Sequence, residues 1–245
     1  MTDAWTALAG DYARHRIGYS PEIYETILQY GARKGSSVLD VGCGTGLSGE
    51  PFAKNGFTVT GVDPSDAMLE RARERLPEAT FVKGSVETLP FPNERFDLAI
   101  SAQTFHWVDR ARALAEVYRV LRRSGVVAIW WKQLAAHDPL MDLRESAFRA
   151  LGKVAPAQGL PGGFKEFYAS SFSDQLLRVI PWRTALSLDQ YMGYERSRCS
   201  VREELGDAAD EYFAGLESRI HERYGEGNPT IPLAYVHFLY LARKQ

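Results

Sequence analysis

The segment 38–46, with the sequence VLDVGCGTG, constrains the fold more than any other part of this 245-residue chain. An apolar run typical of a buried strand leads directly into Gly42, Gly44 and Gly46. Glycine adopts positive φ angles and, without a Cβ, lets a ligand approach the backbone closely. A helix that begins after such a turn offers free N–H groups. The segment therefore predicts a ligand at a turn between strand and helix, with Cys43 as a small residue; the alternative is a plain strand-to-helix turn.

The spacing of these glycines indicates which ligand is bound. Dinucleotide-binding folds use the spacing G-x-G-x-x-G, whereas this chain has G-x-G-x-G, with Asp40 two residues before Gly42. A carboxylate at this point would repel a pyrophosphate. It would suit a cationic amino group, such as the one on the methionine part of S-adenosylmethionine (SAM).

A second acid ends the next apolar run. Asp63, followed by Pro64, lies 17 residues after Gly46, which is room for one helix and one strand. A carboxylate at this place can accept hydrogen bonds from both ribose hydroxyls, as in other nucleotide-binding folds. Alone, Asp63 could equally be a surface residue that caps the next helix. Together with the glycine turn, it favours a nucleoside-containing ligand.

Strands and helices alternate through the first half of the chain. We expect strands at 37–41, 57–62, 80–83, 96–101 and 126–131, and helices at 47–55, 65–76 (with Ser65 as N-cap) and 110–121. Such alternation predicts a parallel sheet covered by helices on both faces. Later, we expect helices at 135–154 and 201–224, a loop at 156–163, a strand at 176–188 interrupted at Pro181, and a last strand at 232–242.

This pattern divides the chain into four expected parts. They are N-terminal cap helices (1–34), the ligand-binding core (35–135), a helical insert or substrate cap with a late core strand (136–200), and a C-terminal helix with the final strand (201–245).

Composition narrows the class of protein. A formal net charge of -2 offers no strongly basic field for a nucleic-acid backbone, so we expect no nucleic-acid partner. Only two cysteines, Cys43 and Cys199, favour a reducing compartment over a disulfide framework. The histidines show no metal-ligand spacing, no run approaches the roughly 20 apolar residues that span a bilayer, and no signal peptide is visible. We expect a cytoplasmic monomer or homodimer with a small-molecule substrate, without a metal and without a membrane partner.

The core motifs resemble those of class I SAM-dependent methyltransferases. LDVGCGTG at 39–46 and GVD at 61–63 are similar to the two leading signatures of that superfamily, and GSVE at 84–87 is similar to the third. The third signature normally reads Gly-Asp-Ala-Glu, and its Asp meets the adenine amino group. Ser85 replaces that Asp, so we expect weaker adenine recognition. The resemblance implies SAM as cofactor, with S-adenosylhomocysteine (SAH) as product. It also implies a Rossmann-like, doubly wound, mostly parallel seven-stranded sheet with an antiparallel last strand and a helical cap. The cofactor-binding residues expected are Asp40, Gly42, Cys43, Gly44, Gly46, Asp63, Pro64, Met68, Ser85, Val86, Glu87, Ser101 and Gln103.

Further features resemble the methyltransferase type 11 branch that includes trans-aconitate methyltransferases. The pair His106–Trp107 follows the fourth expected strand, as in that branch. The segment 12–20 is similar to the N-terminal cap of the branch, and 194–200 is similar to its Tyr-Leu-Arg-Ser-Trp-Ser motif, with Arg198 in place of Trp. The resemblance favours oxygen as the methylated atom. The acceptor-binding residues expected are Tyr12, Arg16, Tyr19, Trp107, Trp131, Arg196 and Arg198.

Each of these side chains has a second interpretation. His106 is a candidate general base, or it packs beside Trp107. Arg196 is the best candidate to clamp an anionic acceptor, because a guanidinium pairs with a carboxylate bidentately; otherwise it lies on a solvated helix face. Trp107 and Trp131 form either the acceptor pocket or part of the core. Tyr12, Arg16 and Tyr19 form either a lid or N-terminal packing.

The expected function is methyl transfer from SAM to a carboxylate or hydroxyl oxygen of a small molecule. An alternative is C- or O-methylation of a quinone, phenol or natural-product scaffold, and another is a SAM-binding module without turnover. A nucleic-acid or protein amino-methyltransferase is disfavoured, because SAQT at 101–104 replaces the Asn/Asp-Pro-Pro-Tyr that such enzymes often carry. The glycine spacing disfavours a NAD-dependent oxidoreductase.

Overall fold

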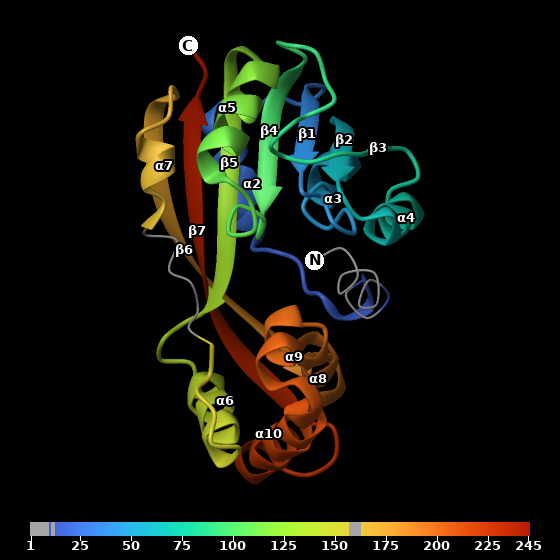
Figure 1. Ribbon diagram of the computed structural model, residues 1–245, viewed down its shortest axis with the longest axis vertical. Coiled ribbons are helices and arrows are strands. Elements are labelled where there is room, and N and C mark those ends of the chain that lie inside the picture. The colour runs from blue at the N-terminus through green and yellow to red at the C-terminus, as the bar shows by residue number, and fades with distance from the viewer. Residues whose placement is uncertain (1–9, 11–12, 157–162) are drawn as a thin grey trace.

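Seven strands form one sheet in the order β3-β2-β1-β4-β5-β7-β6 (Figure 1). A computed structural model describes residues 10, 13–156 and 163–245; Tyr12 and most of the expected loop at 156–163 lie outside this range. The strands are β1 (Ser37–Val41), β2 (Thr58–Asp63), β3 (Thr80–Lys83), β4 (Phe96–Ala102), β5 (Leu121–Leu134), β6 (Ser173–Ser187) and β7 (Thr230–Arg243). The last strand runs antiparallel to β5 and β6, and the pairs among β1 to β5 are parallel. The predicted Rossmann-like sheet with an antiparallel last strand is therefore confirmed.

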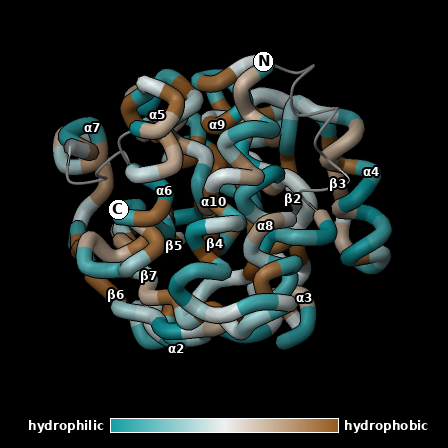
Figure 2. The backbone as a smooth tube through the Cα atoms, turned by 90° about the horizontal axis from the view of Figure 1, so that it is seen from below, coloured by the Kyte–Doolittle hydropathy of each residue, from teal (hydrophilic) through white to brown (hydrophobic). Residues whose placement is uncertain are grey.

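Helices cover both faces of the sheet. Figure 2 shows α2 and α3 on one side of the strands and α5 and α7 on the other. Side chains alternate along β5, so that Trp130 packs with the α2 face and Trp131 with the α5 face. The helices are α2 (Pro21–Tyr30), α3 (Glu50–Lys54), α4 (Asp66–Arg75), α5 (Arg110–Val120), α6 (Pro139–Ala150), α7 (Lys165–Tyr168), α8 (Leu188–Arg196), α9 (Cys199–Leu205) and α10 (Ala209–Tyr224).

The long strands β5, β6 and β7 continue beyond the carboxyl ends of the other strands. There they enter a second group of helices, α6 and α8 to α10, which occupies the lower part of the molecule (Figure 1). A separate apolar core joins these helices to the strand ends, with Phe148, Tyr191 and Tyr212 among its fully buried side chains. The helical segments predicted after residue 135 thus pack together around the ends of the sheet.

Several predicted boundaries differ from the structure. The break expected at Pro181 is wrong, because β6 is continuous; it is an edge strand, where a residue without N–H is tolerated. The helix expected at 201–224 is divided at Gly206, which has φ +53°, and a 3-10 turn (Gly206–Ala208) separates α9 from α10. The helix expected at 47–55 is regular only over Glu50–Lys54. Ser65 is the N-cap of α4 as predicted, since its side chain accepts from the Met68 N–H.

Candidate active site

The glycine turn after β1 adopts the backbone that its sequence predicts. Gly42, Gly44 and Gly46 have φ angles of +66°, +51° and +79°, in the left-handed region. At Gly42 a Cβ would lie 2.3 Å from Cγ2 of Thr104, so packing as well as φ requires glycine there. At Gly44 a Cβ would meet no atom within 4 Å, because this residue lines an open cavity. The turn therefore brings bare backbone to the wall of a cavity.

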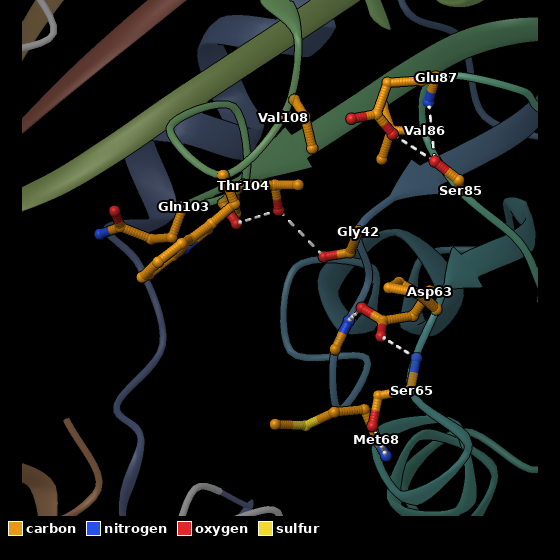
Figure 3. Close-up of a pocket in the computed structure, with 14 residues that line it drawn as sticks. Gly42, Asp63, Ser65, Met68, Ser85, Val86, Glu87, Gln103, Thr104 and Val108 are labelled. Carbon is orange, nitrogen blue, oxygen red and sulfur yellow. Dashed lines mark hydrogen bonds between the residues drawn. The ribbon is translucent and has the colours of Figure 1, made fainter. Parts of the chain in front are cut away.

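Asp63, at the end of β2, is hydrogen-bonded to the backbone of the glycine turn. One carboxylate oxygen accepts the N–H of Gly44 at 3.0 Å and the other accepts the N–H of Ser65 at 2.9 Å (Figure 3). Burial raises the pKa of Asp63, while the hydrogen bonds from Ser65 and Gly44 lower it. Each carboxylate oxygen keeps capacity to accept a further bond, since an ionised carboxylate has about four acceptor sites. The acid thus presents acceptors at the cavity wall.

The cavity itself has a volume of about 240 Å³ and lies at the carboxyl ends of β1, β2 and β4. This is where parallel α/β sheets bind their ligands. Nine of the thirteen expected cofactor-binding residues line it: Gly42, Gly44, Asp63, Pro64, Met68, Ser85, Val86, Glu87 and, from the segment after β4, Gln103. The remaining lining residues are Ser65, Ala102, Thr104, Trp107 and Val108.

Four of the expected cofactor residues lie behind this wall instead. Asp40 is fully buried and accepts a hydrogen bond from Ser48 at 2.7 Å, and burial raises its pKa to about 7. Cys43 packs against α4 and β3, and Ser101 donates to the Val41 carbonyl. A Cβ at Gly46 would lie 3.3 Å from Leu76. These residues hold the turn in place without reaching the cavity.

Ser85 and Glu87 form a small polar unit across the cavity from Gln103 (Figure 3). The Ser85 hydroxyl donates to the Glu87 carboxylate and accepts the Glu87 N–H. The other Glu87 oxygen accepts the N–H of Asp109 at 3.2 Å. Burial opposes ionisation of Glu87, but these hydrogen bonds outweigh it and hold its pKa below the usual value.

His106 lies just outside the residues that line the cavity, next to Trp107, whose ring centroid is 4.8 Å away. Its Nδ1 accepts the Trp131 indole N–H at 3.2 Å. Since an indole N–H only donates, His106 is the neutral tautomer with its proton on Nε2. Surrounding protein and the Arg110 guanidinium lower the pKa of His106 to about 4. The ring thus offers a donor at Nε2 rather than a free basic nitrogen.

The two tryptophans differ in surroundings. Trp107 is 38% exposed and lines the cavity. Trp131 is only 6% exposed and packs edge-to-face against Phe164 and Tyr240. Its position favours the core interpretation.

The expected acceptor-binding arginines are not all together. Arg196 lies on the outer side of α8, 3.4 Å from Glu217, which favours a solvated helix face. Arg16 donates to the Ser197 carbonyl at 3.3 Å and stacks 4.9 Å from the Tyr194 ring centroid. Arg198 lies 3.7 Å from the buried Glu195. Arg16 therefore contacts the end of α8, Arg198 pairs with a buried residue of the same helix, and Arg196 pairs on its outer side.

The residues that line the cavity could hold the adenosine part of SAM. Asp63 supplies acceptors for a ribose, the glycine wall leaves room for close approach, and Met68, Val86 and Val108 supply apolar sides for a flat base. Sequence reasoning missed Ala102, Thr104 and Val108. Only their proximity to Gln103 and Trp107 in the sequence could have indicated them.

Comparison with known proteins bears on this site. Residues 39–129 match the family model described as a methyltransferase domain. An uncharacterized methyltransferase of Mycobacterium bovis is 35% identical over 187 residues, which cover 76% of this chain and 73% of the relative. The chain belongs to the class I SAM-dependent methyltransferases.

Other relatives of this methyltransferase agree with that assignment. A malonyl-[acyl-carrier protein] O-methyltransferase of Salmonella typhimurium is 37% identical, covering 90% of this chain and 83% of the relative. A solved methyltransferase structure from Anaeromyxobacter dehalogenans superposes with a TM-score of 0.70 at 21% identity, covering 94% of this chain and 97% of that one. The enzyme uses SAM.

Over the part of the chain that the structure describes, no helix is long and apolar enough to cross a membrane. Within the same residues, no cluster of His, Cys, Asp and Glu side chains could hold a metal ion.

Proposed function

We propose that this methyltransferase transfers the methyl group of SAM to a carboxylate oxygen of a small anionic acceptor. The observation that carries the proposal is the state of His106. Its Nδ1 is occupied by the Trp131 N–H, and its pKa is lowered to about 4. A general base for a phenol, hydroxyl or amine should have a pKa near the working pH and a free lone pair.

The other ionisable side chains at the described cavity wall are also engaged. Asp63 accepts hydrogen bonds from the N–H groups of Gly44 and Ser65. Glu87 accepts hydrogen bonds from the Ser85 hydroxyl and the Asp109 N–H. Bound SAM supplies an electrophilic methyl group attached to a sulfonium. When the methyl group is transferred, the rest of the cofactor leaves as a neutral thioether, SAH. A carboxylate is already ionised at neutral pH, so this acceptor needs positioning and no base.

Positive charge gathers where the N-terminal segment meets α8 and β5. Arg16, Lys132 and Arg198 lie there, and Arg16 acts on Lys132 electrostatically. Glu195 is shared between Arg144, at 2.8 Å, and Arg198. We propose that Arg16 and Arg198 pair with the acceptor anion, as guanidinium groups suit carboxylates. The malonyl-[acyl-carrier protein] relatives, which are named O-methyltransferases, support oxygen as the methylated atom.

On the cofactor side, we propose that Asp63 accepts the ribose hydroxyls and that Ser85 and Glu87 face the adenine. The Ser85 hydroxyl donates a hydrogen bond to the Glu87 carboxylate and accepts one from the Glu87 N–H, so its second lone pair is available to an amino group. Gly42 and Gly44 lie beside the methionine part. Trp107 lines the same cavity, and we propose that it forms part of the wall on the acceptor side.

The test is methyl transfer from tritiated SAM to matched pairs of acceptors, each a polycarboxylate and its amide, with phenols and quinones as further members. Products are then treated with mild alkali. We expect label from the carboxylates alone, released as volatile methanol because methyl esters hydrolyse. Alkali-stable label on a phenol, amine or carbon would refute the carboxylate and restore the need for a base. No label on any acceptor, with intact SAH binding, would instead support a module without turnover.

A further inference from the structure

Lys132 is a buried cation that the proposed chemistry leaves without a role. It lies on β5, is 8% exposed, and its Nζ donates to the carbonyls of Ile17 at 2.9 Å and Gly18 at 3.0 Å. Both carbonyls belong to the segment 13–20 between the N-terminus and α2. The side chain thus joins the sheet to a part of the chain more than 100 residues away in sequence.

Aromatic rings surround the ammonium group. The centroids of Tyr19 and Tyr235 lie 5.2 Å from Nζ, and those of Trp182 and Tyr194 lie 5.7 Å from it. Ring faces attract a cation and compensate part of the cost of removing it from water. Burial and the nearby Arg16 charge lower the pKa of Lys132. The buried Lys132 amino group has the carbonyls of Ile17 and Gly18 as its directional partners.

The segment that Lys132 holds crosses beneath the carboxyl ends of the central strands (Figure 1). The segment has further contacts along its length, among them the hydrogen bond from Arg16 to the Ser197 carbonyl and the edge-to-face contact of Tyr19 with Trp130. Arg75 of α4 donates to the Ala13 carbonyl at 3.0 Å, and Ser20 caps α2. His15 packs on α8 so closely that a Cβ at Gly193 would lie 2.2 Å from its ring. The Lys132 bonds fix the middle of the segment.

The backbone of Lys132 is also hydrogen-bonded to a residue of the cavity wall. The Lys132 carbonyl accepts from Nε2 of Gln103 at 2.8 Å, and Gln103 lines the cavity with a left-handed φ of +57°. One residue therefore bonds both to the crossing segment and to the cavity wall at the end of β4.

We propose that Lys132 is a positioning residue for methyl transfer. It fixes Ile17 and Gly18 against β5 and thereby sets the acceptor side of the site relative to Gln103 and the cofactor. This inference rests on the proposed function for the identity of the acceptor. That Lys132 fixes the segment 13–20 against β5 does not depend on the proposed function. Because Asp63 and the glycine turn do not depend on Lys132, its loss affects transfer rather than cofactor affinity.

The experiment compares Lys132→Met with Trp182→Leu. Methionine fills similar space but removes both hydrogen bonds, whereas the control removes one ring and keeps them. Hydrogen–deuterium exchange of residues 13–20 is measured in the free enzyme, SAH affinity by calorimetry, and kcat with any acceptor that is labelled. For Lys132→Met we expect exchange at least tenfold faster, kcat at least tenfold lower and SAH affinity within threefold of wild type. For Trp182→Leu we expect segment exchange and kcat within threefold of wild type.

Exchange and kcat must change together. Slower transfer with unchanged exchange, faster exchange with unchanged kcat, or equal effects in Trp182→Leu would each overturn the proposal. If Lys132→Met does not fold, the same measurements are made on Lys132→Arg, which keeps the charge and donors. Exchange and kcat should then either both stay within threefold of wild type or both change, and a change in one alone would overturn the proposal. Should no acceptor be labelled, the proposed function fails, while the exchange measurement still decides whether Lys132 fixes the segment.

Discussion

Replacement of Gly42 by alanine should expose how the turn after β1 is built. The left-handed φ of +66° costs a non-glycine residue about 1–2 kcal/mol. The added Cβ would also lie 2.3 Å from Cγ2 and 2.5 Å from Oγ1 of Thr104, and overpacking of this kind costs typically about 1–3 kcal/mol. We expect Gly42→Ala to lower the free energy of unfolding by about 2–5 kcal/mol and to weaken SAH binding, because the wall of the cavity must shift.

Denaturant unfolding and SAH calorimetry on a set of variants separate these contributions. Gly152→Ala is the matched control, since Gly152 has φ +67° and open space around its Cβ position, so it should lose only the conformational part. Thr104→Ala removes the two closest atoms and should recover about 1–2 kcal/mol in the double variant. Equal destabilisation of Gly42→Ala and Gly152→Ala, with additive behaviour at Thr104, would refute the steric argument.

Other perturbations test single side chains of the site. Asp63→Ala should weaken SAH binding at least about tenfold, or roughly 1.4 kcal/mol, by calorimetry, because the ribose loses its acceptor; unchanged affinity would remove that role. His106→Asn should keep kcat within about threefold in the tritium assay and leave the pH profile flat near neutrality, since a residue with pKa about 4 is already neutral there; a hundredfold loss would restore the base. Burial raises the pKa of Asp40 to about 7, so the native state retains a proton that the unfolded chain loses near pH 4. Stability should therefore fall as pH rises between these values, by an amount on the order of 4 kcal/mol, and urea unfolding should show this decline removed in Asp40→Asn. Arg196→Ala should leave the acceptor KM unchanged, because Arg196 pairs with Glu217 at the surface; a raised KM in steady-state kinetics would return it to the site.

The cofactor side of this enzyme could be predicted from sequence because its determinants are local. Gly42 and Gly44 line the cavity, and Asp63 reaches it from the next strand end. Strand-end positions of a parallel sheet converge at one edge, so spacing along the chain translates into proximity. The spacing did not reveal which side chains face the cavity. Asp40 and Ser101 lie on the neighbouring strands β1 and β4, but their side chains are buried in the protein and do not line the cavity.

The extent of the strands was less predictable. Residue patterns indicated only 126–131 for β5, whereas the strand runs over Leu121–Leu134. The two ends of β5 contain charged residues such as Arg122 and Lys132. In the sequence alone, such residues indicate that the strand has already ended. Pairing with β7 over nine residue positions, from Val126↔Arg243 to Leu134↔Tyr235, extends the carboxyl end of the strand beyond its own pattern. Tertiary pairing of this kind overrides local propensity.

The proposed acceptor side of the site consists of parts of the chain that no local pattern connects. Ile17 and Gly18 meet Lys132, whose ammonium lies among rings from β6, α8 and β7. The residues that line the cofactor cavity fall between Gly42 and Val108, inside the range that matches the methyltransferase domain model, whereas Lys132 and α8 lie outside it. A family match of this extent therefore identifies the methyl donor and leaves the acceptor open. We expect substitutions at the junction of the N-terminal segment, β5 and α8 to change the acceptor while the glycine turn keeps its structure, because Lys132 and α8 do not line the cofactor cavity. The two sides are joined by the Gln103–Lys132 hydrogen bond and by Arg75, which donates to the carbonyls of Thr45 and Ala13.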